Sequence, residues 1–178
     1  MESTVAEYRK AVAACKALFE KKTKDYGTAW RVLRLPSITD QIFIKAQRIR
    51  SIQEKGIQKV NDTVRDEFIG IVNYCIIAFI QMRLGDNDNL EMTYSQLETL
   101  YDEIVDEALG LLEKKNHDYG EAWREMRIGS ITDIIMMKLL RIKQIEDNEG
   151  KTLVSEGVAS NYADIINYGI FALIKMDS

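Results

Sequence analysis

One block of side chains that could bind ions or ligands occurs twice in the chain. Residues 21–31 read KKTKDYGTAWR and residues 114–124 read KKNHDYGEAWR, 93 residues further on, with eight of eleven positions identical. Carboxylates can hold a metal ion, aromatic faces can stack on a base, and guanidinium groups can grip an anion. The candidates are Asp25, Tyr26, Trp30 and Arg31 in the first copy, and Asp118, Tyr119, Trp123 and Arg124 in the second.

A structural interpretation of the same block stays open beside the chemical one. Gly27 and Gly120 are the kind of residue at which a helix ends in a left-handed conformation. Trp30 and Trp123 have the size and shape of wedges that pack between helices. On this view the block holds helices together and binds nothing.

A pair of cations follows each block. Lys45 and Arg48, and likewise Lys138 and Arg141, are three residues apart, which places both charges on one helical face. Lysine can bind a phosphate as a point charge and arginine can bind it through two hydrogen bonds. Solvated surface charge is the usual explanation for such a pair, and the presence of the pair in both copies adds phosphate binding as a second interpretation.

The third candidate group lies further along each copy and differs between the copies. The first copy has Glu67 and Asn73, and the second has Asn161, Asp164 and Asn167, spaced three residues apart on an otherwise apolar face. Such residues either form a network of hydrogen bonds between helices or hold Mg²⁺ against a phosphate. Gly70 stands where Asp164 stands in the second copy, so any site should be asymmetric.

Several other chemistries lack the residues that they need. The formal charge of −4 argues against nonspecific binding of nucleic acid. The only histidine, His117, is replaced by Lys24 in the other copy, and no phosphate-binding glycine loop or zinc motif occurs. Cys15 and Cys75 lie on apolar helical stripes without a histidine nearby in the sequence, so we expect two reduced core cysteines.

These side chains must be positioned by a duplicated helical scaffold. Residues 21–53 and 114–146 are identical at 18 of 33 positions. After one inserted residue, the similarity continues between residues 71–78 and 165–172. A 3.6-residue apolar period predicts three helices per copy. One proline and ten glycines are few for the many tight turns that a β-sandwich or β-barrel needs. We therefore expect an all-α protein: two tandem three-helix repeats that pack as a six-helix body with approximate two-fold symmetry.

The boundaries of the repeats follow from turn-forming residues. We expect the first repeat at 1–84, a linker rich in Gly, Asp and Asn at 85–93, and the second repeat at 94–178. Ser37 and Asp40, like Ser130 and Asp133, have the spacing of a capping box that opens the second helix. Thr63 and Asp66 should cap the third helix in the same way.

The sequence also predicts where the protein works. The longest strongly apolar run, residues 74–80, is far shorter than the roughly 20 residues that span a bilayer. The first four residues begin no secretory signal. We expect a cytoplasmic protein that does not bind membranes, and a homodimer through the same apolar faces is a further possibility.

The repeated block with the Ser-Ile-Thr-Asp and Lys-x-x-Arg that follow it resembles the nucleotide-modification-associated domain 1 family. The resemblance covers nearly the whole chain, once per repeat, and implies an all-helical fold linked to nucleotide modification. The third helices also look like the Glu-x-x-Asp helix of the MazG-like and dimeric dUTPase pyrophosphohydrolases. That second likeness implies Mg²⁺ held by helical carboxylates, of which each repeat retains one, Glu67 or Asp164.

Two hypotheses result. In the first, the protein binds a nucleotide and hydrolyses a nucleoside triphosphate with Mg²⁺ held by Asp164 and Glu67, assisted by Asp25 or Asp118. The cation pairs, the arginines, tyrosines and tryptophans of the block, and Asn73 and Asn167 would contact the substrate. In the second, the protein is a helical interaction or regulatory module without a small ligand.

Overall fold

The computed structural model describes residues 2–56, 61–85, 89–151 and 157–178, except the side chains of Asn61, Asp62 and Tyr119. Six α-helices and two short 3₁₀ turns, and no β-strand, occur in this part of the chain. The helices are α1 (Glu2–Tyr26), α2 (Leu35–Lys55), α3 (Asn61–Leu84), α4 (Tyr94–Tyr119), α5 (Ile128–Asp147) and α6 (Val158–Asp177). The 3₁₀ turns are η1 (Ala29–Val32) and η3 (Ala122–Glu125). The expected all-α fold is confirmed.

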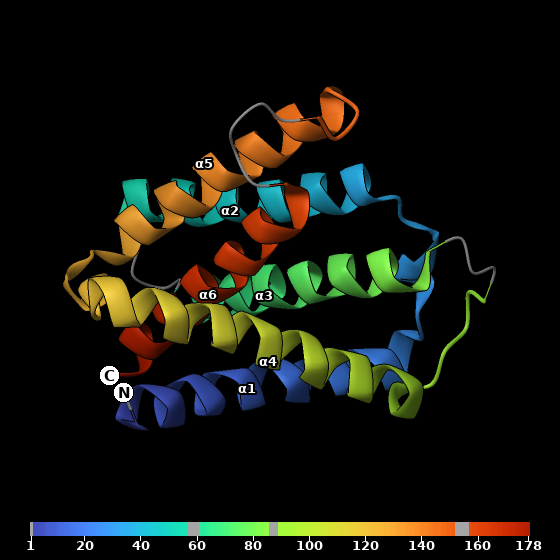
Figure 1. The fold of residues 1–178 in the computed structure, drawn as a ribbon, viewed down its shortest axis with the longest axis horizontal. Coiled ribbons are helices and arrows are strands. Elements are labelled where there is room, and N and C mark those ends of the chain that lie inside the picture. The colour runs from blue at the N-terminus through green and yellow to red at the C-terminus, as the bar shows by residue number, and fades with distance from the viewer. Residues whose placement is uncertain (1, 57–60, 86–88, 152–156) are drawn as a thin grey trace.

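Each helix packs against its counterpart from the other repeat. Contacts join α1 to α4, α2 to α5 and α3 to α6. Figure 1 shows α1 and α4 along one side, α2 and α5 along the opposite side, and α3 and α6 between them. The two connections that carry the repeated block lie at opposite ends of the long axis. This arrangement has the approximate two-fold symmetry expected from the duplication.

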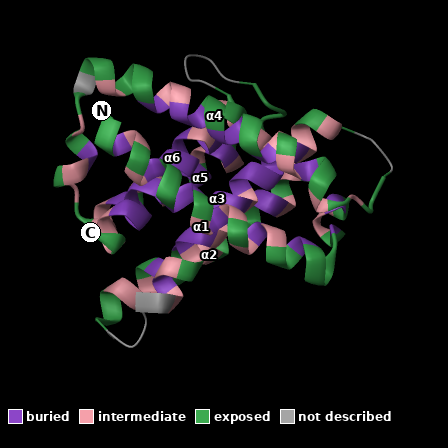
Figure 2. Ribbon diagram, turned by 90° about the horizontal axis from the view of Figure 1, so that it is seen from below, coloured by how far each residue is buried: buried purple, intermediate pink, exposed green. Residues whose placement is uncertain are grey.

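The core lies on α3 and α6, which Figure 2 shows as the most continuously buried helices. Within residues 63–84, an 18-residue stretch has a mean hydropathy of 1.4, and this helix could span a bilayer by length and composition. Because 56% of that stretch is buried in the fold, its composition is explained by its place in the core. The apolar run is thus longer than the one selected from the sequence, but its apolar side chains are covered by protein.

Two reciprocal hydrogen-bonded pairs tie the repeats together at the centre. The Tyr101 hydroxyl on α4 donates to Asn73 Oδ1 on α3 over 2.7 Å, and the Tyr8 hydroxyl on α1 donates to Asn167 Oδ1 on α6 over the same distance. Each asparagine also donates from Nδ2 to a carbonyl of its own repeat, Cys15 or Ala108. Burial raises the pKa values of Tyr8 and Tyr101, so both hydroxyls stay protonated donors. Each repeat therefore completes the other's polar core.

The three predicted helix caps are wrong. Helix α2 begins at Leu35 and α5 at Ile128, two residues before the serines, and Thr63 lies inside α3. Pro36 occupies the first turn of α2, where its missing N–H is not needed, so the helix extends back past Ser37. The structure instead forms a capping box at the start of α4, between Thr93 and Gln96.

The division of the chain into repeats at 1–84 and 94–178 stays a prediction. Helix α3 ends at Leu84 and α4 begins at Tyr94, so residues 85–93 connect the repeats. Cys15 and Cys75 are free and buried, and burial raises the pKa of Cys15 to about 12. Neither thiol is therefore ionised near neutral pH. Cytoplasmic location and homodimerisation stay predictions.

Candidate functional site

Two equivalent cavities lie at the two copies of the repeated block. The first has a volume of about 510 Å³ and the second about 450 Å³. Both are lined by the same structural positions: a lysine and the end of the first helix, the glycine and tryptophan of the block, and an Asn-Tyr pair of the third helix. In the first these are Lys22, Gly27, Trp30, Asn73 and Tyr74; in the second, Lys115, Gly120, Trp123, Asn167 and Tyr168.

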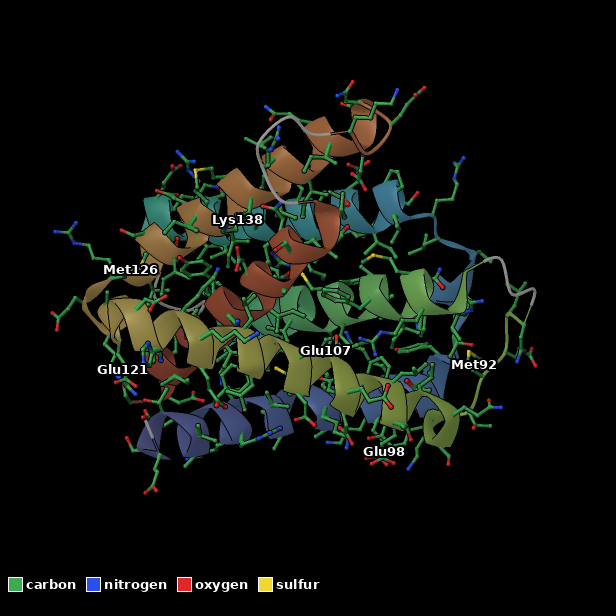
Figure 3. The ribbon with its side chains drawn as sticks, in the orientation of Figure 1. Met92, Glu98, Glu107, Glu121, Met126 and Lys138 are labelled. Atoms are coloured by element: carbon green, nitrogen blue, oxygen red, sulfur yellow. The ribbon has the colours of Figure 1, made fainter. Side chains whose placement is uncertain are left out.

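The cavities lie far apart. In Figure 3, Met126, which lines the second cavity, lies at one end of the long axis, and Met92 lies at the other. Met92 borders a hollow next to the first cavity that shares Tyr26, Gly27 and Ala29 with it. The two copies of the block thus line two separate cavities.

Local structure explains how the block positions its tryptophans. Gly27 and Gly120 have φ values of 67° and 65°, which side-chain-bearing residues rarely adopt, and each N–H donates to the carbonyl four residues earlier. Both glycines have the expected positive φ, but Gly120 has a ψ of −154° and is not in the left-handed helical conformation. The chain then turns through η1 or η3, which places Trp30 or Trp123 back over the helices.

The first cavity combines aromatic surface with an uncompensated cation. Tyr26 is 77% exposed at its edge and Trp30 is half-buried in its wall. Lys22 has no ion-pair partner, and Trp30 no ring contact, among the described residues. The exposed Gln41 adds an amide that can donate and accept hydrogen bonds. Such a lining suits a ligand that has a planar ring and, attached to it, a negatively charged group.

The second cavity has the same framework, but its charge and its tryptophan are already engaged. Lys115 Nζ lies 2.6 Å from Asp164 Oδ1 and Lys138 Nζ lies 2.9 Å from Asp164 Oδ2. Trp123 stacks on Phe171 with ring centroids 4.3 Å apart and an angle of 4° between the planes. The Trp123 indole N–H is buried without a hydrogen-bond partner in the part of the chain described. This cavity therefore satisfies its own cation and aromatic face.

The two acids proposed as metal ligands lie in separate ion-pair clusters. Glu67 on α3 lies 3.0 Å from Arg48 and 3.4 Å from Lys45, both on α2. Asp164 on α6 contacts lysines of α4 and α5. No group of three His, Cys, Asp or Glu residues that could hold a metal ion occurs among the described residues. Both acids are paired with cations in this structure, and a magnesium site at either of them stays a prediction.

Gly70 explains why the acids differ in position. A Cβ at Gly70 would meet Lys45 Cε at 3.1 Å, so the Lys45 side chain fills the space that Asp164 occupies in the second repeat. Lys45 Nζ also lies 5.6 Å from the centre of the Tyr74 ring. In the first repeat, the predicted phosphate-binding pair Lys45 and Arg48 is therefore held by Glu67.

The arginines of the block are held by structural contacts. Arg31 is buried and donates to Gln81 and to the Asn89 carbonyl of the linker. Arg124 donates to Thr4 Oγ1 over 2.9 Å and to Glu7 Oε1 over 2.8 Å, both on α1. These contacts join the block to other helices and to the linker, as the structural interpretation of the block predicts.

The other predicted residues are spread over the surface. Asp25 and Asp118 are exposed and do not line either cavity. The Tyr119 side chain lies outside the described residues. Arg141, on the exposed side of α5, donates to Gln144 over 3.3 Å. The amides of Asn73 and Asn167 line the cavities but are engaged in the central pairs described above.

Sequence reasoning missed Lys22, Lys115 and Gln41. The two lysines occupy the same position in the two copies of the block. Each precedes the tyrosine of its copy by four residues, a spacing that puts the lysine and the tyrosine on one helical face. That signal was available. Gln41 has no such signal, because Ile134 stands in its place in the second repeat.

Comparison with known proteins identifies the family. A family model described as nucleotide modification associated domain 1 matches residues 22–82 and again 115–176, one match per repeat. No curated protein and no solved structure matches the chain. The two matched regions together cover more than half of the chain and contain the lysine, the tryptophan and the third helix of each cavity. The chain therefore belongs to the nucleotide modification associated domain 1 family, as a tandem duplicate.

Proposed function

We propose that the protein binds a nucleotide in the first cavity, with the base against Trp30 and the phosphate at Lys22. The observation that carries the proposal is the pairing of an unstacked indole with an uncompensated ammonium group in one cavity. A volume of about 510 Å³ is within the range of roughly 300–1,000 Å³ typical of small-ligand cavities. The family description, which refers to nucleotide modification, agrees with this ligand class.

The charges favour a nucleotide with few phosphates. Of the cations near the first cavity, Lys45 and Arg48 are paired with Glu67, which leaves Lys22 to neutralise the ligand. A triphosphate carries more negative charge than one lysine balances, whereas a monophosphate does not greatly exceed it. The amide of Gln41 supplies a donor and an acceptor for the edge of the base. We therefore propose a nucleoside monophosphate.

Hydrolysis of a triphosphate with Mg²⁺ stays a prediction from the looser resemblance. The described carboxylates give it no support, because Glu67 and Asp164 each contact two cations and belong to different clusters. Its test is an assay of pyrophosphate release with the Asp164→Asn variant, which should be inactive but folded if Asp164 holds the metal. We derive no catalytic step from it.

The test of binding is a thermal-shift and calorimetric titration with nucleoside mono-, di- and triphosphates, each with and without Mg²⁺. A ligand that binds only the folded state raises the melting temperature. Lys22→Met should weaken monophosphate binding by about tenfold, the effect expected for a lost charge-assisted hydrogen bond of roughly 1.5 kcal/mol.

Lys21→Met is the matched control, because it removes the same charge from the neighbouring residue, which does not line the cavity. Equal losses in both variants would show a general charge effect and contradict a phosphate site at Lys22. A flat response of the parent protein to the whole panel would favour the helical interaction module.

A further inference from the structure

The two cavities differ at two positions that decide whether an anion with an attached ring can enter. Asp164 in the second repeat corresponds to Gly70 in the first, and Phe171 corresponds to Ile77. Both residues of the second repeat contact the groups that would receive a ligand: the carboxylate holds Lys115, and the phenyl ring covers Trp123. The framework around them is shared.

We infer that Asp164 and Phe171 act as a built-in substitute for a nucleotide and exclude nucleotides from the second cavity. The carboxylate stands in for the phosphate and the phenyl ring stands in for the base. This inference rests on the proposed function of the first cavity. It makes Gly70 and Ile77 the residues that leave the first cavity open.

Geometry supports the substitution for phosphate. Asp164 is 7% exposed and bridges two ammonium groups from different helices, at 2.6 and 2.9 Å, as a phosphate oxygen pair would. A second anion would have to displace this carboxylate from Lys115 or be repelled by it. Bridging ammonium groups from two helices is also the arrangement that a phosphate between α4 and α5 would produce.

Geometry also supports the substitution for the base. Phe171 lies nearly parallel to Trp123, and the Tyr168 ring meets the Phe171 ring edge-on with centroids 5.7 Å apart. Stacking of two flat rings at 4.3 Å is the contact that a base would make with an indole. In the first repeat the aliphatic Ile77 cannot provide it, and Trp30 stays available.

The chain offers one reporter for each cavity, because Trp30 and Trp123 are its only tryptophans. Trp123→Phe leaves Trp30 to report on the first cavity, and Trp30→Phe leaves Trp123 to report on the second. The probes are the four common 2′-deoxynucleoside 5′-monophosphates, titrated one at a time while indole fluorescence is recorded. We expect a saturable change from Trp30 and none from Trp123.

Opening the second cavity should then create a second site. In the Trp30→Phe background, Asp164→Gly with Phe171→Ile should produce a saturable Trp123 response that the background lacks. Asp164→Asn with Phe171→Ile, which keeps the size of residue 164, is the alternative if the glycine variant does not fold. A Trp123 response before either change, or none after them in a folded protein, overturns the inference.

The converse experiment closes the first cavity. Gly70→Asp should weaken the Trp30 response at least tenfold, whereas Gly70→Asn, of equal size, should retain most of it. The atoms nearest to a Cβ at residue 70 belong to the flexible end of Lys45, which can move aside. Equal losses from both substitutions would show a steric effect and contradict exclusion by charge.

The outcomes separate the inference from the proposed function. A response from Trp123 only after Asp164 and Phe171 are replaced, with none from Trp30 in any variant, refutes the proposed function and supports the inference. A response from Trp30 with none from Trp123 in any variant does the reverse. Silence of both tryptophans in every folded variant overturns both.

Discussion

The two repeats share their centre and differ at their outer ends. At the centre, Tyr8 with Asn167 and Tyr101 with Asn73 make the same hydrogen bonds in both directions. At the ends, one acid per repeat has moved by one turn of the third helix, from Glu67 in α3 to the position of Asp164 in α6. The comparison teaches that the two repeats keep the same central packing, whereas a different position of one acid and the exchange of Ile77 for Phe171 make the two cavities chemically different.

The largest expected difference between the repeats is in the packing of their tryptophans. Trp123 is 5% exposed and stacked, so Trp123→Ala should lower the free energy of unfolding by about 3–5 kcal/mol. Trp30 is half-buried, so Trp30→Ala should cost only about 1–2 kcal/mol. Urea unfolding of both variants measures this. Equal losses would mean that Trp30 is packed as tightly as Trp123 and is not available to a ligand.

The next difference is in the acids. Asp164→Ala leaves two ammonium groups near a buried position and should cost about 1–3 kcal/mol, discounted from a fully buried pair because Lys115 is half exposed. Glu67→Ala should cost less than about 1 kcal/mol, since Arg48 is 59% exposed and returns to water. Chemical denaturation at low and high salt distinguishes the two variants. A larger loss of unfolding free energy in Glu67→Ala than in Asp164→Ala would mean that the ion pairs of Glu67 contribute more to stability than those of Asp164.

The central pairs should show no difference. Tyr8→Phe and Tyr101→Phe each remove one buried hydrogen bond and leave an asparagine oxygen without its donor, at a cost of about 1–2 kcal/mol. Denaturation of the two variants should give equal losses, because the geometry is the same. A clear inequality would show that the symmetry of the centre is only apparent. Tyr94→Phe, at a half-buried tyrosine outside these pairs, is the control.

The smallest expected effect depends on pH. Burial raises the pKa of Glu146, although the Thr39 hydroxyl that donates to it acts in the opposite direction. A raised pKa in the folded state favours the protonated form, so this contribution to stability is present at low pH and is lost as pH rises through the folded-state value. Glu146→Gln, which copies Gln53 of the first repeat, should therefore stabilise the protein at neutral pH.

That gain should vanish below about pH 4, where the carboxyl is protonated in the folded and unfolded states alike. Thermal melts of the variant and the parent across this range measure it. Asp147→Asn, at the neighbouring exposed acid, is the control. A gain that persists at low pH would mean that burial of the Glu146 charge is not its cause.

The fold was predictable from the sequence because the duplication shows each helix twice. The apolar period and the repeated block were enough to predict six helices. The predicted starts of α2 and α5 were wrong by two residues: Pro36 suits the first turn of α2, and α5 begins at Ile128 without a side-chain cap. The site was harder to predict, since the sequence gives Asp164 and Glu67 as acids on equivalent helices but does not show which cations lie beside each. Only the packing of α4 and α5 around α6 shows that Asp164 is neutralised by lysines.

The reciprocal tyrosine–asparagine pairs have a consequence for the order of synthesis. A ribosome completes α1 to α3 before α4 exists, so Asn73 emerges long before Tyr101, its partner, is made. Until then, Asn73 Oδ1 lacks the hydroxyl that donates to it in the folded protein. The apolar face of α3 that α6 will cover is also without its partner. The first repeat therefore keeps this apolar face of α3 uncovered until α6 has been made.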